Sequence, residues 1–302
     1  MSRGDPLTEG LFDPDFLRRM RALFFKLRQR HRLRHRGVQP TPALGFTREF
    51  KDYRQYTRSD DFRSIDWRLF ARTERLFVKL YEEIQEFHVH ILIDRSASMV
   101  DPFPRKRVAA VRLAAALAYL GLLNQHRVSI HSFGTGLREE IPPAKGQGHI
   151  HRMIRTLSAL EFGGETDLRV LTRFRPRRDR RGIVFILSDL LGRDGEDPVP
   201  ALQASSAWPA ETHVVHVLDP EELRPQWLGD VQLTDVETGE QASFAITEAD
   251  LQRYGDALRD HLDRIAEGCA SRRLSYVPWR SDESFERRFL ELLTRDRVLN
   301  RR

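Results

Sequence analysis

Strongly apolar runs recur along the chain from residue 87 onward, and they are short. Residues 87–94 read FHVHILID, residues 182–187 read GIVFIL and residues 212–218 read THVVHVL. Runs of this length, rich in β-branched residues, are typical of strands buried on both faces of a sheet. Comparable patterns predict further strands over three ranges: 76–82, 128–133 and 274–278.

The segments between these runs have helical periodicity, and one of them is the Ala- and Leu-rich stretch at 105–124. Similar patterns predict helices over five more ranges: 149–160, 168–174, 200–206, 248–270 and 283–293. Residues 228–246 instead predict a hairpin that turns around 237–239, inserted between a strand and a helix. Strands that alternate with helices predict an α/β fold, a mostly parallel central sheet with helices on both faces.

The first 85 residues follow different patterns. Residues 14–36 predict a helix whose single apolar stripe includes Phe16 and Met20, and the Pro-containing stretch 37–45 predicts a linker. Residues 46–75 interleave aromatic and charged side chains. We therefore expect a helical arm at 1–36, a second segment at 37–85 and the α/β domain at 86–296. The stripe is narrow, so we expect the arm to be separable from the core.

Charge is concentrated in the arm. The chain has a formal net charge of +6 and an isoelectric point near 9.7, and residues 18–36 contain nine Lys or Arg and no acidic residue. Such an arm suits an acidic protein, an anionic membrane surface or nucleic acid. The arm lacks the interleaved aromatics that stack on bases, so specific nucleic-acid binding is not expected. The residues proposed to contact a partner or anion are Arg18, Arg19, Arg21, Lys26, Arg28 and Arg30.

Composition narrows the class of protein further. The single cysteine, Cys269, excludes an intrachain disulfide and a thiolate metal cluster. The longest apolar stretch, 108–123, is interrupted by Arg112 and is shorter than a membrane span, and the first ten residues lack the apolar core of a signal peptide. We therefore expect a cytoplasmic protein, with a peripheral contact at the membrane left open.

Oxygen-bearing side chains follow the predicted strands. Asp94, Ser96 and Ser98 follow the first buried strand at alternate positions, Thr166 lies in the Gly-rich loop 163–167, and Asp189 follows a later strand. Ligands of open α/β sheets bind at the carboxyl ends of the strands. Two carboxylates and three hydroxyls are hard donors suited to Mg²⁺ or Mn²⁺, with room left for water and one ligand from outside. Asp167 is expected to support this set without binding the cation directly.

These motifs resemble a known family. Asp-x-Ser-x-Ser, then Gly-Gly-x-Thr, then Asp after a strand resemble the metal-ion-dependent adhesion site (MIDAS) of von Willebrand factor A domains. The upstream segments EFKDYRQY, DDFRSIDW, AR and VKLYE resemble the signature of the bacterial domain of unknown function 58 family, which contains such a domain. Many A domains continue the last motif as Asp-Gly, whereas Asp189 is followed by Leu190. The likeness covers roughly residues 35–295.

The resemblance implies a Rossmann-like von Willebrand factor A fold and a metal site at Asp94, Ser96, Ser98, Thr166 and Asp189. It also implies pairing with a MoxR-type AAA+ ATPase in a chaperone-like or assembly role. We therefore expect a non-catalytic, metal-dependent protein-binding module whose partner, the ATPase or its client, offers an acidic residue. The sequence contains no P-loop motif, no Gly-x-Ser-x-Gly and no His-Glu-x-x-His.

Two alternatives come from other classes. The first is a metal-dependent phosphoester hydrolase that uses the carboxylates of Asp94, Asp167 and Asp189. The second is an adaptor that binds nucleic acid or an anionic membrane through the basic arm. Hydrolysis assays with Mg²⁺ and Mn²⁺ separate the first from a binding module, and salt-dependent binding to DNA or liposomes tests the second.

Other chemistry-bearing residues have simpler interpretations. His88 and His90 share one face of a strand, as do His149 and His151 in their own pair, but no third ligand is evident, so packing or surface roles are favoured. In the 46–75 segment we expect a structural clasp with Trp67 buried and Arg and Asp side chains paired around it.

Overall fold

The computed structural model describes residues 15–23, 47–57, 60–84, 87–176, 182–192, 195–236 and 238–295. The chain divides into two compact units, one comprising Met1–Arg28 and Phe87–Arg301, the other Gln29–Glu86 with Arg302. The linker predicted at 37–45 lies outside the described residues. Each unit is treated by itself below.

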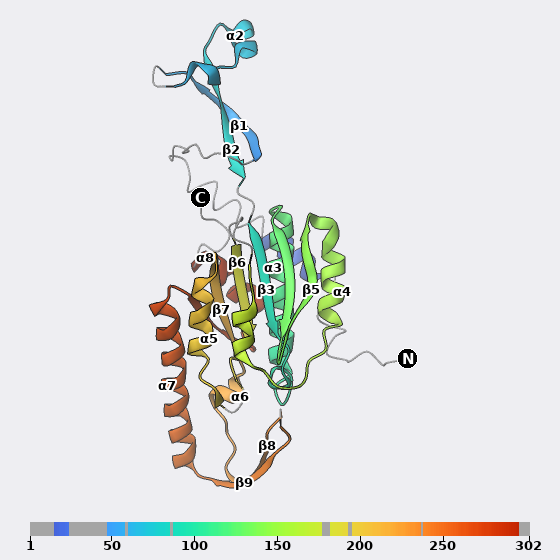
Figure 1. The fold of residues 1–302 in the computed structure, drawn as a ribbon, viewed down its shortest axis with the longest axis vertical. Helices are drawn as coiled ribbons and strands as arrows, with labels where there is room; N and C mark the ends of the chain where they lie inside the picture. The colour runs from blue at the N-terminus through green and yellow to red at the C-terminus, as the bar shows by residue number, and fades with distance from the viewer. Residues whose placement is uncertain are drawn as a thin grey trace. The chain divides into compact units, whose positions relative to one another are not determined.

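The larger unit is built on a six-stranded sheet with the order β10-β7-β6-β3-β4-β5 (Figure 1). All neighbouring strands are parallel except β5, which runs antiparallel to β4. The strands are β3 (His88–Asp94), β4 (Arg127–Phe133), β5 (Leu137–Lys145), β6 (Gly182–Ser188), β7 (Ala210–Leu218) and β10 (Ser275–Arg280). The α/β class with a mostly parallel central sheet is therefore confirmed.

Side chains alternate between two cores, one on each face of this sheet. Ile91 and Ile93 of β3 face a core formed with α3 (Arg105–Leu123), α4 (Ile150–Ser158) and α8 (Phe285–Arg295). The opposite face, which includes Leu92, packs against other elements. These are a 3₁₀ segment (Leu168–Arg173), α5 (Val199–Ala204) and α7 (Glu248–Ser271). The central strands are buried on both faces, as their continuous apolar runs predict.

The first described part of the helical arm packs against this unit. Of the predicted helix, residues 15–23 are described and helical. Phe16 is 1% exposed and Met20 is fully buried, and both belong to the core on the α3 face. The ring of Phe16 lies 5.7 Å from that of Phe285 in α8. The apolar stripe of this part therefore belongs to the core, and the prediction that the arm can be removed is one that a deletion must test.

The inserted hairpin is present at the end of the unit where the parallel strands finish (Figure 1). Residue 218 of β7 leads into α6 (Pro220–Leu223), which is followed by β8 (Gly229–Thr234) and β9 (Gln241–Ile246). Antiparallel pairing places Val231 opposite Phe244 and Leu233 opposite Ala242. One face of the hairpin is therefore apolar, yet Leu233 is 38% and Phe244 50% exposed.

The smaller unit pairs β1 (Thr47–Gln55) with β2 (Phe77–Ile84) and carries α2 (Trp67–Thr73). The predicted clasp around a buried Trp67 is wrong, because Trp67 is 57% exposed. The buried residue is Asp66 beside it, at 7% exposure. Its carboxylate accepts the N–H groups of Arg68 and Leu69 and the hydroxyl of Tyr53, so it caps α2 from inside.

Candidate metal centre

The predicted ligands meet at the carboxyl ends of β3 and β6, which are adjacent parallel strands. Asp94, Ser96 and Thr166 are fully buried, Asp189 is 2% exposed and Ser98 is 6% exposed. Burial of five oxygen-bearing side chains at one edge requires that they satisfy one another or a bound group.

Backbone hydrogen bonds hold the two ligand loops against each other. Ala97 N–H donates to the Gly164 carbonyl at 2.9 Å, and Gly163 N–H donates to the Arg95 carbonyl at 2.8 Å. Gly163 and Gly164 have φ of 154° and 76°, so this close approach uses backbone conformations that suit glycine. The glycine pair therefore brings Thr166 next to Asp94, 72 residues earlier in the chain.

Asp94 is the centre of the hydrogen-bond network. Its Oδ1 accepts the Thr166 hydroxyl at 2.7 Å and Ser96 N–H at 3.0 Å, and its Oδ2 accepts the Ser188 hydroxyl at 2.6 Å. Burial raises the pKa of Asp94 to about 6 and the nearby Asp189 carboxylate adds to this, while the three hydrogen bonds lower it. A buried carboxylate of this kind is best compensated by a cation.

The two serines are not simple helix caps. Ser96 precedes the short 3₁₀ segment Ala97–Met99, but its side chain makes no capping hydrogen bond. Its Oγ instead lies 2.9 Å from the Oγ of Ser98. A pair of hydroxyl oxygens that face each other beside a carboxylate forms part of a hard-oxygen donor set.

Asp189 is held by two neighbours that the sequence did not indicate. Its Oδ2 accepts from Lys106 Nζ at 2.8 Å, and its Oδ1 accepts from Leu191 N–H at 3.2 Å. Lys106 also pairs with Glu222 of α6. Burial alone would lower the pKa of the Lys106 ammonium, but the two carboxylates outweigh burial and raise it, so Lys106 is a buried cation.

Leu190 directly follows Asp189, at the position where the resemblance noted in the sequence would place glycine. It adopts a φ of 56°, in the left-handed region, and its N–H donates to the Ser188 hydroxyl oxygen at 2.9 Å. Its side chain is 1% exposed within the second core. Burial of the leucine side chain offsets a strained backbone, and the loop keeps the conformation that a glycine would adopt easily.

Asp167 forms an ion pair with Arg169. Its Oδ1 accepts both the backbone N–H and Nε–H of Arg169, and its Oδ2 accepts from the same guanidinium. It caps the 3₁₀ segment Leu168–Arg173. The Asp167 carboxylate is thus occupied by Arg169, and its support of the metal ligands and its part in the hydrolase alternative remain predictions.

The donor chemistry fits a hard divalent cation. Within the described ranges, no group of three or more His, Cys, Asp or Glu side chains is arranged to hold a metal ion. A cation here would depend on hydroxyls as well as on carboxylates, which suits Mg²⁺ or Mn²⁺ rather than Zn²⁺ or Cu²⁺.

The residues predicted to bind an anion differ in their surroundings. Arg18 pairs with Asp15, and Arg19 Nε lies 2.9 Å from the Glu286 carboxylate of α8. Arg21 is exposed. Lys26, Arg28 and Arg30 lie outside the described residues. At least Arg19 therefore serves to attach the helix to α8.

The paired histidines on β3 are buried packing residues. The rings of His88 and His90 stack at 3.7 Å, and His90 Nδ1 and His131 Nε2 lie 2.9 and 3.2 Å from the Ser129 hydroxyl. Burial lowers the pKa of His90 to about 3 and that of His131 to about 4.

These lowered pKa values predict acid sensitivity. Below about pH 6.5 these histidines become protonated in the unfolded state but stay neutral in the folded state. The free energy of unfolding therefore falls as the pH drops toward 4. At about pH 4.5 each of the two histidines lowers the free energy of unfolding by roughly 3 kcal/mol relative to neutral pH. We expect His90→Met to lose less stability than wild type between pH 8 and pH 5 in urea titrations. The control is His151→Met, at an exposed site on α4. Parallel pH profiles for wild type and His90→Met would refute this assignment.

The comparisons with known proteins identify the family. Residues 52–264 match the family described as "Protein of unknown function DUF58", and the chain belongs to it. It is 30% identical over 252 residues to "Uncharacterized protein Rv1480" of Mycobacterium tuberculosis, covering 80% of this chain and 77% of that protein. The same figures apply to "Uncharacterized protein Mb1516" of Mycobacterium bovis.

Solved structures of similar fold include the conserved hypothetical protein BatB from Bacteroides thetaiotaomicron. It has 17% sequence identity and a TM-score of 0.40 over 69% of this chain and 98% of that chain. A von Willebrand factor type A structure from Catenulispora acidiphila has 16% identity and a TM-score of 0.35 over 66% of this chain and 44% of that chain. Among the described residues, no helix combines the length and apolar character needed to cross a membrane.

Proposed function

We propose that this protein is a non-catalytic binding module. In this proposal Asp94, Ser96, Ser98, Thr166 and Asp189 hold Mg²⁺ or Mn²⁺, and the site captures an acidic side chain of a partner protein. The single observation that carries the proposal is the buried network around Asp94, in which a carboxylate and hydroxyls from separate loops converge at one sheet edge. The bound cation would supply an electrophilic centre for an anionic oxygen.

Residues of the chain orient the proposed metal ligands before any cation binds. Thr166 and Ser188 orient Asp94 through their hydroxyls. The loops at 94–98 and 163–167 are fixed to each other by backbone hydrogen bonds, so the donor set is preorganised. The family resemblance points to a MoxR-type AAA+ ATPase or its client as the partner, and to a location in the cytoplasm or at the membrane surface.

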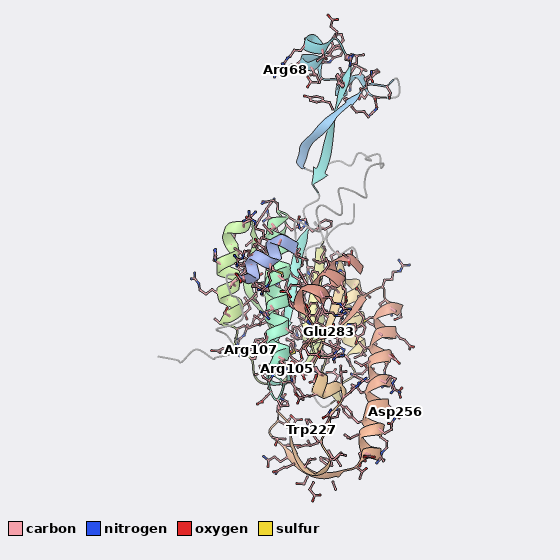
Figure 2. The ribbon with its side chains drawn as sticks, turned by 180° about the vertical axis from the view of Figure 1, so that it is seen from behind. Arg68, Arg105, Arg107, Trp227, Asp256 and Glu283 are labelled. Atoms are coloured by element: carbon pink, nitrogen blue, oxygen red, sulfur yellow. The ribbon has the colours of Figure 1, made fainter. Side chains whose placement is uncertain are left out.

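Exposed apolar side chains near the site support a protein partner. Trp227 and Leu228, at the start of the hairpin, are 42% and 53% exposed. Figure 2 shows Trp227 at the same end of the unit as Arg105, in the first turn of α3. Aromatic and apolar groups that surround a polar centre are typical of protein interfaces. We therefore expect the partner to cover the apolar face of the hairpin as well as the site.

The experiment is capture of a purified MoxR-type ATPase by the immobilised full chain. We expect binding in Mg²⁺, at least tenfold weaker binding in EDTA, and similar losses for Thr166→Ala and Phe244→Ser. The matched controls are Thr294→Ala on α8 and Gln232→Ser on the polar face of the hairpin, which should bind as wild type does. Circular dichroism checks the fold of every variant. Equal capture in Mg²⁺ and EDTA would show that the metal plays no part in binding.

A further inference from the structure

Lys106 lies in a place that its sequence context does not suggest. It belongs to an Arg-Lys-Arg run at the start of α3, where a solvated side chain is the ordinary expectation. Its side chain is nevertheless 1% exposed and reaches Asp189 and Glu222. A lysine is almost never fully buried unless it is paired, so this position is built around the ammonium.

The two carboxylates of the candidate centre differ in how they are compensated. Among the described residues, the donors to Asp94 are neutral: the hydroxyls of Thr166 and Ser188 and the N–H of Ser96. Asp189 accepts a charged donor at 2.8 Å and a backbone N–H on its other oxygen. Asp94 therefore offers a negative charge that no ion pair compensates among the described residues, whereas Asp189 shares the Lys106 ammonium with Glu222.

We propose that Lys106, although Asp189 belongs to the proposed ligand set, competes with the metal ion for the Asp189 carboxylate and so sets the metal affinity of the site. This inference rests on the proposed metal-dependent function. The ammonium and a divalent ion compete for the same carboxylate, and at an effective dielectric constant of about 20 their repulsion is substantial at short range. Lys106 thereby weakens metal binding.

The pairing of Lys106 with Asp189 also favours an anionic ligand on the bound metal ion. A divalent ion held by one free carboxylate and several hydroxyls keeps excess positive charge, which a carboxylate from outside neutralises. Lys106 also compensates Asp189 in the absence of metal, so the metal-free unit avoids a second buried, unpaired carboxylate. The lysine thus favours a site that binds metal weakly alone and more tightly together with an acidic ligand.

The test uses Mn²⁺ as the probe in calorimetry on the full chain, with four proteins. They are wild type, Glu222→Gln, Lys106→Met and the double variant Lys106→Met/Glu222→Gln. The double variant keeps the net charge of the Lys106, Asp189 and Glu222 cluster at the wild-type value while freeing Asp189. Glutamine at 222 can still accept the Asp219 N–H that Glu222 accepts at 2.9 Å, so the cap of α6 is preserved.

We expect the double variant to bind Mn²⁺ at least tenfold more tightly than wild type. Glu222→Gln should stay at or below the wild-type affinity, because it leaves the Lys106 to Asp189 pair intact. In EDTA, Lys106→Met should unfold at a lower temperature than wild type, and Mn²⁺ should raise its midpoint by more. Lys145→Met on β5 is the control for loss of a lysine and should match wild type in both measurements.

Equal affinity of wild type and the double variant would show that Lys106 is only a structural ion-pair partner. Weaker binding by the double variant would show that Lys106 positions Asp189 for coordination, the opposite of the proposal. Absence of Mn²⁺ binding in both proteins would instead overturn the proposed metal site, so the two failures are distinguishable.

Discussion

Replacement of Asp94 by asparagine is expected to abolish metal binding while leaving the fold intact. Outer partners of metal ligands are typically worth about 10–100-fold in affinity. Removing the charge of the central carboxylate should cost more than about a hundredfold, because Asp94 accepts hydrogen bonds from neutral donors and, in the part of the chain that the structure describes, forms no ion pair. Mn²⁺ calorimetry on Asp94→Asn and wild type measures this directly.

The metal-free variant should at the same time be more stable than metal-free wild type. Burial raises the pKa of Asp94 to about 6, so folding at pH 8 includes the cost of burying an ionised carboxylate. The cost is present above pH 6 and disappears as the carboxyl becomes protonated below it. We expect Asp94→Asn to gain roughly 1–3 kcal/mol at pH 8 in EDTA, by order of magnitude.

This pair of effects separates a functional site from a structural network. If the Asp94 carboxylate served only to stabilise the fold, Asp94→Asn would be less stable than wild type and its metal affinity would be unchanged. If the Asp94 carboxylate serves to bind a cation, the metal-free variant is more stable than metal-free wild type and does not bind the metal ion. Asp167→Asn is the matched control, since Asp167 is an acidic residue of the neighbouring loop 163–167 and pairs with Arg169. Unchanged Mn²⁺ affinity in Asp94→Asn would contradict the metal centre.

The sheet and most helices could be predicted because their signal is local. The buried strands at 88–94 and 182–188 are continuous apolar runs, and the helix at 105–123 is a long stretch rich in Ala and Leu, which favour helix. β5 was not predicted, since it contains Pro142 and Pro143 and lacks regular alternation. It is tolerated as the edge strand of the sheet, where proline need not donate to a neighbour.

The candidate site was predictable only in part. The spacing of Asp94, Ser96 and Ser98 is a local feature, and strand ends are expected to meet at one edge. Lys106 and Glu222 could not be predicted, because their burial depends on the packing of α3 against α6, residues more than a hundred positions apart. A charged residue type favours exposure, and only tertiary structure shows the exception.

The exposure of Trp67 was mispredicted for a related reason. An aromatic residue within an Arg- and Asp-rich segment favours a buried anchor, since large apolar side chains are usually covered. In the structure Asp66 is the residue turned inward, because its carboxylate satisfies the first N–H groups of α2. The cap at Asp66 fixes the start of α2 at Trp67, whose side chain is left outside.

The N-terminal helix should have the largest effect on stability. Phe16 is 1% exposed, its ring contacts Phe285, and the Arg112 guanidinium lies 5.8 Å from its centroid. Truncation of a buried phenylalanine typically costs about 3–5 kcal/mol through lost burial and the cavity left behind. We expect Phe16→Ala to lose that amount in urea unfolding, and Met20→Ala about 2–5 kcal/mol by the same reasoning.

Deletion of residues 1–23 should therefore leave an unstable larger unit rather than an intact core. Removing the helix uncovers the apolar surface of α3 and α8 that Phe16 and Met20 cover, and it leaves Glu286 without its partner Arg19. The control is Arg21→Ala, at an exposed position of the same helix, which should change stability by no more than about 0.5 kcal/mol. If the truncated chain unfolds cooperatively at the wild-type midpoint, the helix is a separable arm and its basic side chains are free to serve an anionic partner. If the midpoint falls as expected, Phe16 and Met20 are core residues, and the basic charge of this segment is presented from a helix fixed to the domain.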